Sequence, residues 1–226
     1  MAKEVKLGII TIGQSPRVDF TADILDILDE KFVIYEKGAL DNFTYDEVLE
    51  KFKPDENDSI LVSRLRDGRQ VKIGESHILS LLQKCIDNLE AEGIDVILLL
   101  CTGHFPEFKH NVLLIKPEEL LHTCTSKLQR TKKIGVFVPN TDQVKETVAR
   151  WKRNKVDIVT TVASPYMNLE QIKAASEEFI NNKEVGIIFM DCMGYSIEMK
   201  EIVRDITNKP VILPRTLIAR ILNELY

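Results

Sequence analysis

The sequence lacks the features that mark several classes of protein. Its four cysteines are too few for a disulfide framework in 226 residues, and no two of them form a CxxC metal motif. No apolar run approaches the roughly 18 to 20 residues that cross a bilayer. The first residues, Met1 to Lys6, do not have the pattern of a signal peptide. We therefore expect a cytoplasmic protein with reduced thiols and no membrane partner.

Excess positive charge and glycine-rich phosphate loops are also missing. A net charge of -5 gives no reason to expect nucleic acid as a partner. The phosphate-loop and dinucleotide glycine patterns do not occur, which disfavours a nucleotide. His77, His110 and His122 are scattered, which favours surface or packing roles over a metal site. The sequence therefore predicts a small anionic molecule as partner, no cofactor and no metal.

Short apolar runs alternate with amphipathic segments along the whole chain. We expect strands at residues 5–12, 32–36, 95–100, 112–115, 133–138, 157–162, 185–191 and 211–213. We expect helices at residues 17–29, 45–52, 74–92, 117–129, 141–153, 169–181, 196–206 and 214–225. Strands that alternate with helices form right-handed βαβ units, so the predicted fold class is α/β with parallel sheet. The charged run 150–155 is typical of a solvated helix end.

The two halves of the chain begin and end alike. Residues 6–10 (KLGII) parallel residues 133–137 (KIGVF), and each half later has an apolar run that ends in cysteine, with glycine two positions on. A duplicated unit needs about 36 extra residues in the first copy. A predicted hairpin around Asp67-Gly68 lies where these residues would be. We expect an N-terminal half (1–130) with an insertion near 38–75, a C-terminal half (131–213), and a last helix (214–226) packed on the N-terminal half.

The two strand-end cysteines are Cys101 and Cys192. A lone buried cysteine is usually an ordinary small hydrophobe. Here both follow apolar runs, and ligands in parallel sheets bind beyond the carboxyl ends of the strands. The repeated position therefore favours a cleft shared by the two thiols.

A pair of facing thiols suits proton transfer at carbon. One thiolate takes a proton, and the opposite thiol returns one on the other face, without a cofactor. Because a free cysteine has a pKa of about 8.5, the site has to stabilise a thiolate and the developing charge on the substrate. His104 is a candidate for shifting Cys101 toward its anion.

The turn after the first strand, residues 13–17, offers a second set of polar groups. Ser15 is a plausible helix cap with Pro16 at the first helical position. The backbone amides, the Ser15 hydroxyl and Arg17 then either receive an anion or serve the cap alone. The candidate substrate-binding residues of the whole chain are Thr11, Gly13, Ser15, Arg17, Thr102, Gly103, His104, Asn140, Thr141, Met193 and Gly194.

Four segments resemble the AroM-like family within the Asp/Glu/hydantoin racemase superfamily. They are residues 11–17 (TIGQSPR), 101–104 (CTGH), 191–194 (DCMG) and 217–220 (LIAR). The resemblance implies two pseudo-symmetric Rossmann-like halves with the site between them, and one catalytic cysteine from each half. In that superfamily the first cysteine is usually followed by Asn-Thr and the second by Thr. Here Thr102-Gly103 replaces the first pair, and Met193-Gly194 is closer to the hydantoin racemase or arylmalonate decarboxylase variant.

The resulting hypothesis is a cofactor-independent racemase or isomerase that acts on a small carboxylate or cyclic amide with an acidic C–H. Cys101 and Cys192 are its predicted acid/base pair. Two alternatives stay open: a decarboxylase-like enzyme that uses a single cysteine, and a non-catalytic protein that binds or senses a small ligand. Association into a homo-oligomer is compatible with each of these three hypotheses.

Overall fold

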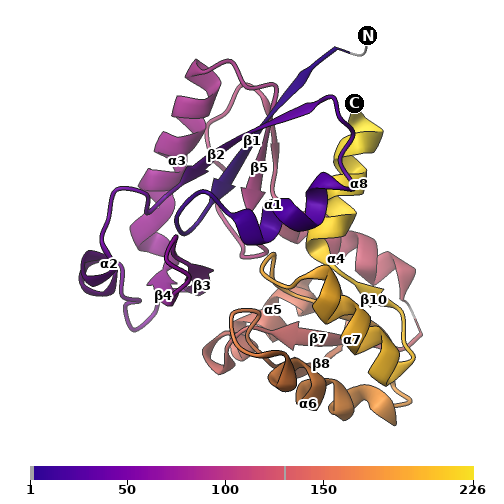
Figure 1. Cartoon of the computed structure of the whole chain (residues 1–226). Helices are drawn as coiled ribbons and strands as arrows, with labels where there is room; N and C mark the ends of the chain where they lie inside the picture. The colour runs from indigo at the N-terminus through magenta and orange to yellow at the C-terminus, as the bar shows by residue number, and fades with distance from the viewer. Residues whose placement is uncertain (1–2, 130) are drawn as a thin grey trace.

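Two four-stranded parallel sheets form the centre of the molecule, a computed structural model that describes residues 3–129 and 131–226 (Figure 1). The first sheet has the order β2-β1-β5-β6 and contains β1 (Val5–Thr11), β2 (Phe32–Gly38), β5 (Val96–Leu100) and β6 (Leu113–Ile115). The second has the order β10-β9-β7-β8 and contains β7 (Lys133–Val138), β8 (Ile158–Val162), β9 (Val185–Met190) and β10 (Val211–Ile212). Each sheet belongs to one half of the chain.

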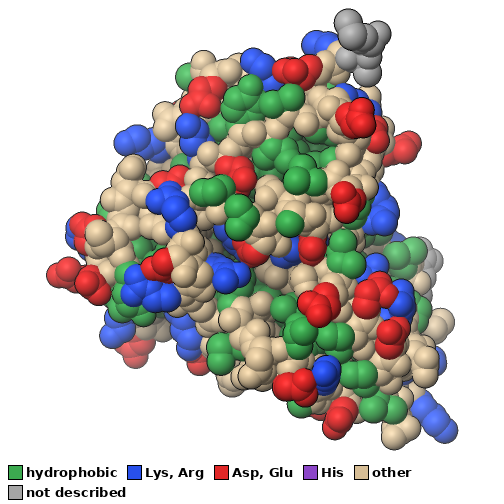
Figure 2. All heavy atoms as spheres, viewed as in Figure 1, with side chains coloured by type: hydrophobic (Ala, Val, Ile, Leu, Met, Phe, Trp, Pro, Cys, Tyr) green, Lys and Arg blue, Asp and Glu red, His purple; other side chains and the backbone are tan. Residues whose placement is uncertain are grey.

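Helices connect and cover the strands, which confirms the predicted α/β fold. They are α1 (Val18–Leu25), α2 (Tyr45–Lys51), α3 (Glu75–Ala91), α4 (Pro117–Leu128), α5 (Val144–Arg153), α6 (Leu169–Ile180), α7 (Ile197–Thr207) and α8 (Pro214–Leu225), with a 3-10 turn at Thr141–Gln143 before α5. Among the described residues, no helix is long and apolar enough to cross a membrane. Acidic and basic side chains are interspersed over the face shown in Figure 2.

The continuous apolar runs of the sequence became the most deeply buried strands. Every residue of β5 is buried, and all of β1 is buried except Lys6. Side chains of β1 and β5 belong to the same hydrophobic cluster as Ile134, Val136 and Phe189 of the second sheet. A parallel sheet is covered on both faces, so its strands need no polar alternation. One shared core therefore fixes the two sheets against each other.

The antiparallel hairpin of β3 (Ile60–Arg64) and β4 (Gln70–Gly74) belongs to neither large sheet. It is tied to the second half by hydrogen bonds. The Gln143 side-chain amide donates to the Ile60 carbonyl at 2.9 Å, and the Ser164 hydroxyl donates to the Gln70 side chain at 2.5 Å. The hairpin thus reaches from the first half across to the second.

The last helix, α8, contacts α1 of the first half. Asn223 of α8 donates to the Ile27 carbonyl at 2.7 Å and accepts from the Asp29 amide at 3.0 Å. These bonds satisfy backbone groups just beyond the end of α1. The helix ends at Leu25, whereas the sequence predicted that it would continue to Asp29.

The start of α1 also differs from the prediction. Ser15 is not its cap: the N-cap is Arg17, without a side-chain cap bond, and Pro16 lies outside the helix. The reason is a partner distant in sequence, because the Ser15 hydroxyl donates to Asp41 at 2.7 Å and the Ser15 amide donates to the same carboxylate at 2.7 Å. An internal carboxylate thus occupies the groups that were expected to cap the helix or to receive an anion.

Candidate active site

Cys101 and Cys192 lie at equivalent strand ends and line the same cavity. Cys101 directly follows β5, and Cys192 is two residues beyond the end of β9. The amide of Gly103 donates to the Cys101 sulfur at 3.3 Å, and the amide of Gly194 donates to the Cys192 sulfur at 3.3 Å. The same tight turn is therefore built twice, once in each half.

The cavity between the thiols has a volume of about 20 Å³, which is room for about one water molecule. Its walls come from three parts of the chain: the hairpin, the ends of β5 and β9, and the segment from Pro139 into α5. The lining residues are Leu61, Val62, Cys101, Thr102, Gly103, Pro139, Gln143, Thr147, Arg150, Asp191 and Cys192. In this closed form the site has no space for a carboxylate substrate.

The two thiols have different electrostatic surroundings. The pKa of Cys101 is raised to about 12, chiefly by burial. The neighbouring Cys192 and Asp191 add to this rise, whereas the Gly103 amide and Arg150 oppose it. Burial also raises the pKa of Cys192, but the Gly194 amide, the Arg17 charge and the Tyr166 hydroxyl oppose that rise. The surroundings of Cys192 therefore include more groups that favour a thiolate.

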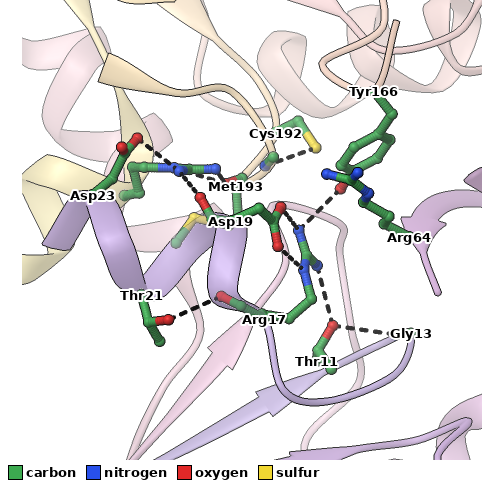
Figure 3. A network of polar contacts seen from close by, with 12 residues as sticks. Thr11, Gly13, Arg17, Asp19, Thr21, Asp23, Arg64, Tyr166, Cys192 and Met193 are labelled. Carbon is green, nitrogen blue, oxygen red and sulfur yellow. Dashed lines mark hydrogen bonds and ion pairs between the residues drawn. The ribbon is translucent and has the colours of Figure 1, made fainter. Parts of the chain in front are cut away.

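Arg17 connects the first half to the surroundings of Cys192 (Figure 3). Its guanidinium donates twice to Asp19 at 2.8 Å and once to the Thr11 hydroxyl at 3.3 Å. It also donates to the Tyr166 hydroxyl of the second half at 3.4 Å. A Cβ atom on Gly194 would lie 2.6 Å from that hydroxyl, so the turn after Cys192 requires glycine to admit Tyr166.

Asp191 is the buried carboxylate of the site. Its oxygens accept from the Trp151 indole at 3.3 Å and lie 3.4 Å from the His122 ring and 3.5 Å from Arg150. Burial alone would raise the pKa of Asp191. The His122 ring, Arg150 and the Thr102 hydroxyl outweigh burial and hold this pKa at about 2, so Asp191 is a carboxylate at neutral pH.

Several predicted substrate-binding residues lie outside the cavity wall. The Asn140 side chain accepts from the Asp142 amide at the 3-10 turn, and Thr141 is exposed. The His104 ring faces Glu118 at 3.1 Å and is absent from the groups that set the pKa of Cys101. Met193 is buried in the core. Of the predicted set, only Thr102 and Gly103 line the cavity together with the two cysteines, while Thr11, Arg17 and Gly194 lie in the network around Cys192.

Sequence reasoning missed Arg150 and Tyr166. Arg150 is 5% exposed, so its assignment to a solvated helix end was wrong: the Glu146, Thr147 and Asp191 side chains hold it inside. Tyr166 comes four residues after β8, and that position beyond a parallel strand was the available signal.

Among the described residues, two groups of side chains outside the cavity each bring three nitrogen and oxygen atoms within 4.8 Å of one another. They are Asp55, Asp58 and His77, and His104, Glu118 and Glu119. Neither group lines the space between the thiols.

Comparison with known proteins identifies the family of the chain. The family model described as AroM protein matches residues 7–226, whereas no curated protein matches the chain. Among solved structures, Nocardia farcinica maleate cis-trans isomerase is 14% identical over 98% of this chain and 92% of that chain, with a TM-score of 0.66. Glutamate racemase from Aquifex pyrophilus is 15% identical over 98% and 84% (TM-score 0.60), and Picrophilus torridus aspartate racemase is 18% identical over 98% and 94% (TM-score 0.61). At these identities the likeness shows a common fold. The chain belongs to the AroM protein family.

Proposed function

We propose that this protein is a cofactor-independent racemase or isomerase that moves a proton at an acidic C–H of a small carboxylate or cyclic amide. The observation that carries the proposal is the pair of thiols at equivalent strand ends, facing one small cavity. The named functions of the racemases and the isomerase with this fold support the same kind of reaction.

The two thiols take opposite roles. A thiol with a pKa of about 12 is ionised in only about one molecule in 10⁵ at pH 7, so Cys101 serves as the acid. Cys192, with Arg17 and Tyr166 beside it, serves as the base. The Cys192 thiolate takes the proton from carbon, the electron pair moves into the adjacent carbonyl or carboxylate, and Cys101 protonates the opposite face of that carbon. The reverse direction exchanges the two roles.

Arg150 is the group proposed to bind the negative charge of the substrate. Its Nε atom is buried without a hydrogen-bond partner among the described residues, and its side chain lines the cavity. The side-chain oxygen of Gln143, also on the cavity wall, is likewise unpartnered in this part of the structure. Buried polar atoms are normally satisfied, so these two are suited to a ligand. A guanidinium with a free N–H also matches the geometry of a carboxylate.

Substrate entry requires the cavity to open. The hairpin residues Leu61 and Val62 form part of its wall, and the hairpin is held to the second half by side-chain bonds to Gln143 and Ser164. We propose that these bonds separate when a substrate enters and form again around it, which excludes water during proton transfer.

The test is hydrogen exchange at carbon in D2O, followed by NMR. The probes are both enantiomers of aspartate, of glutamate and of a 5-substituted hydantoin, each with a C–H beside a carbonyl or carboxylate, tested with the full chain. The proposal predicts that one probe gains solvent deuterium, and that inversion or isomerisation of that probe is lost in Cys101→Ala and in Cys192→Ala. Cys124→Ala is the matched control, since Cys124 is exposed and outside the cavity. Turnover that survives both cavity substitutions would contradict the proposal.

A further inference from the structure

Four acid/base side chains form a line from the thiol cavity to solvent. Asp191, on the cavity wall, has Oδ1 3.4 Å from Nε2 of His122. Nδ1 of the same ring lies 3.6 Å from Oε1 of Glu118, and Oε2 of Glu118 lies 3.1 Å from Nδ1 of His104. The His104 side chain is 46% exposed, whereas His122 is fully buried. The two inner residues, His122 and Glu118, each use one atom toward the cavity and another atom toward solvent.

His122 is held at the centre of this line and its hydrogen bonding is incomplete. Its ring stacks on Trp151 with centroids 4.0 Å apart and meets the edge of Phe189. Its Nδ1 atom has no hydrogen-bond partner among the described residues. A buried histidine that serves packing alone normally satisfies both ring nitrogens. The ring is fixed in orientation, and its Nδ1 atom lies a few tenths of an ångström beyond hydrogen-bond distance from the Glu118 carboxylate. Such a nitrogen is suited to exchange a proton with that carboxylate.

We propose that Asp191, His122, Glu118 and His104 form a proton relay between the thiol cavity and solvent. The inference rests on the proposed function, because a two-base reaction leaves its proton on the wrong thiol after each turnover. The starting state returns only when one thiol loses a proton and the other thiolate gains one. Cys101 and Cys192 are only partly exposed, and the cavity that they line has room for about one water molecule, so direct exchange with bulk solvent is restricted.

The transfer conserves protons and moves no electrons between residues. A proton from water enters at His104 and passes to Glu118. Glu118 gives a proton to Nδ1 of His122, whose Nε2 gives one to Asp191, since an imidazole can accept at one nitrogen and donate from the other. Asp191 delivers a proton to the thiolate across a space of about one water molecule. One proton is consumed outside and one S–H bond forms inside; the opposite direction releases a proton.

The energies of the two ends favour this direction of delivery. Asp191, with a pKa of about 2, holds a proton only transiently, whereas the Cys101 thiolate, with a pKa of about 12, retains one. Two basic side chains of α5 lie beside the line: Arg150 is 3.5 Å from Asp191, and Arg153 is 3.5 Å from Glu118. Glu119 lies beside the outer end of the line, at His104 and Glu118.

The relay can be measured without any substrate. The infrared S–H band of each thiol is followed after rapid transfer of the full chain into D2O, with Cys101→Ala and Cys192→Ala used to assign the bands. His104→Gln breaks the relay at its exposed end, where folding is least affected, and His122→Asn breaks it at the centre. His110→Gln is the matched control, because the His110 ring pairs with the Val112 carbonyl on the surface.

We expect His104→Gln and His122→Asn to slow the exchange of the two cavity thiols by at least about tenfold, within the range of general acid–base effects. His110→Gln is expected to change nothing, and the Cys85 band, outside the cavity, is expected to keep its rate in every variant. Unchanged exchange in His104→Gln would overturn the relay, even if His122→Asn fails to fold. If exchange of the Cys85 thiol slows as much as exchange of the cavity thiols, the relay is also overturned. That result would mean that the variant opens less often as a whole.

The two proposals fail in different ways. If none of the carbon-acid probes turns over but thiol exchange depends on His104, the relay stands and the proposed reaction fails. If turnover needs both cysteines but thiol exchange ignores His104, the relay alone fails.

Discussion

Replacing Asp191 by asparagine removes the buried negative charge around which the inner wall of the site is built. The carboxylate is 3% exposed and is faced by His122, Trp151 and Arg150. Asparagine keeps the shape but not the charge, so two basic groups lose their anionic partner. Breaking one member of a buried ion pair typically costs about 3 to 5 kcal/mol, and we expect a loss of stability at pH 7 in that range.

The pH dependence of that loss follows from the pKa of Asp191. A fall from the ordinary 3.8 to about 2 corresponds to about 2 kcal/mol of stability at neutral pH. Because the pKa is lower in the folded state, this contribution is complete above pH 3.8 and is lost as the pH falls through 2. Between pH 5 and pH 3 it falls by about 1 kcal/mol. Asparagine does not titrate, so the stability difference between the two proteins should shrink by that amount.

Urea denaturation of both proteins at several pH values between 5 and 3 measures this difference. Asp142→Asn is the control, since Asp142 is exposed and its ion pair is with the exposed Lys72. For this variant we expect a difference below about 1 kcal/mol. A stability difference for Asp191→Asn that stays constant from pH 5 to pH 3 would refute the assignment of a strongly lowered pKa to this carboxylate.

Three further predictions concern the surroundings of Cys192, the ion pair between Arg215 and Asp23, and the thiol of Cys85. Tyr166→Phe removes a hydroxyl that lowers the pKa of Cys192. The pH at which the alkylation rate of Cys192 begins to rise should therefore be higher in the variant than in the parent protein. Arg215→Met leaves Asp23 and the Met193 carbonyl without their buried donor, which should cost about 3 kcal/mol in urea denaturation. Burial raises the pKa of Cys85 to about 11, so it should resist iodoacetamide at pH 9.

These three predictions have separate controls. An alkylation profile of Cys192 that is unchanged in Tyr166→Phe would contradict the role of the hydroxyl. Lys133→Met breaks an exposed pair with Glu184 and should change the free energy of unfolding little. An equally small effect of Arg215→Met would show that the Arg215 pair is unimportant. Cys124 is exposed and should be alkylated at pH 9 under conditions that leave Cys85 unmodified.

The sheet and the positions of the cysteines could be predicted because their signals are local. A run such as 96–100 is buried throughout, and such a run identifies a strand covered on both faces without knowledge of its neighbours. Most consecutive strands of the two large sheets are connected through a helix, so the strands of each sheet point the same way and their ends share an edge. The place of each cysteine at the carboxyl edge of its own sheet was therefore predictable.

The remaining features depend on contacts between residues far apart in the sequence. Ser15 was expected to cap a helix, but it bonds to Asp41, 26 positions away. Arg150 lies in a charged run of the sequence, yet Asp191, which follows β9, holds it inside. His122 was expected at the surface or in satisfied packing; it is buried, but one ring nitrogen has no partner among the described residues. No local pattern encodes such partners.

The most direct test of the account is the stereochemistry of exchange in the single-cysteine variants. Cys101→Ser and Cys192→Ser each keep one thiol, which faces one side of the substrate carbon. With a chiral probe that the parent racemises, each variant should exchange the C–H of one enantiomer with D2O, the two variants should choose opposite enantiomers, and neither should racemise it. Exchange of the same enantiomer by both variants, or racemisation by either, would contradict a mechanism in which Cys101 and Cys192 act from opposite faces.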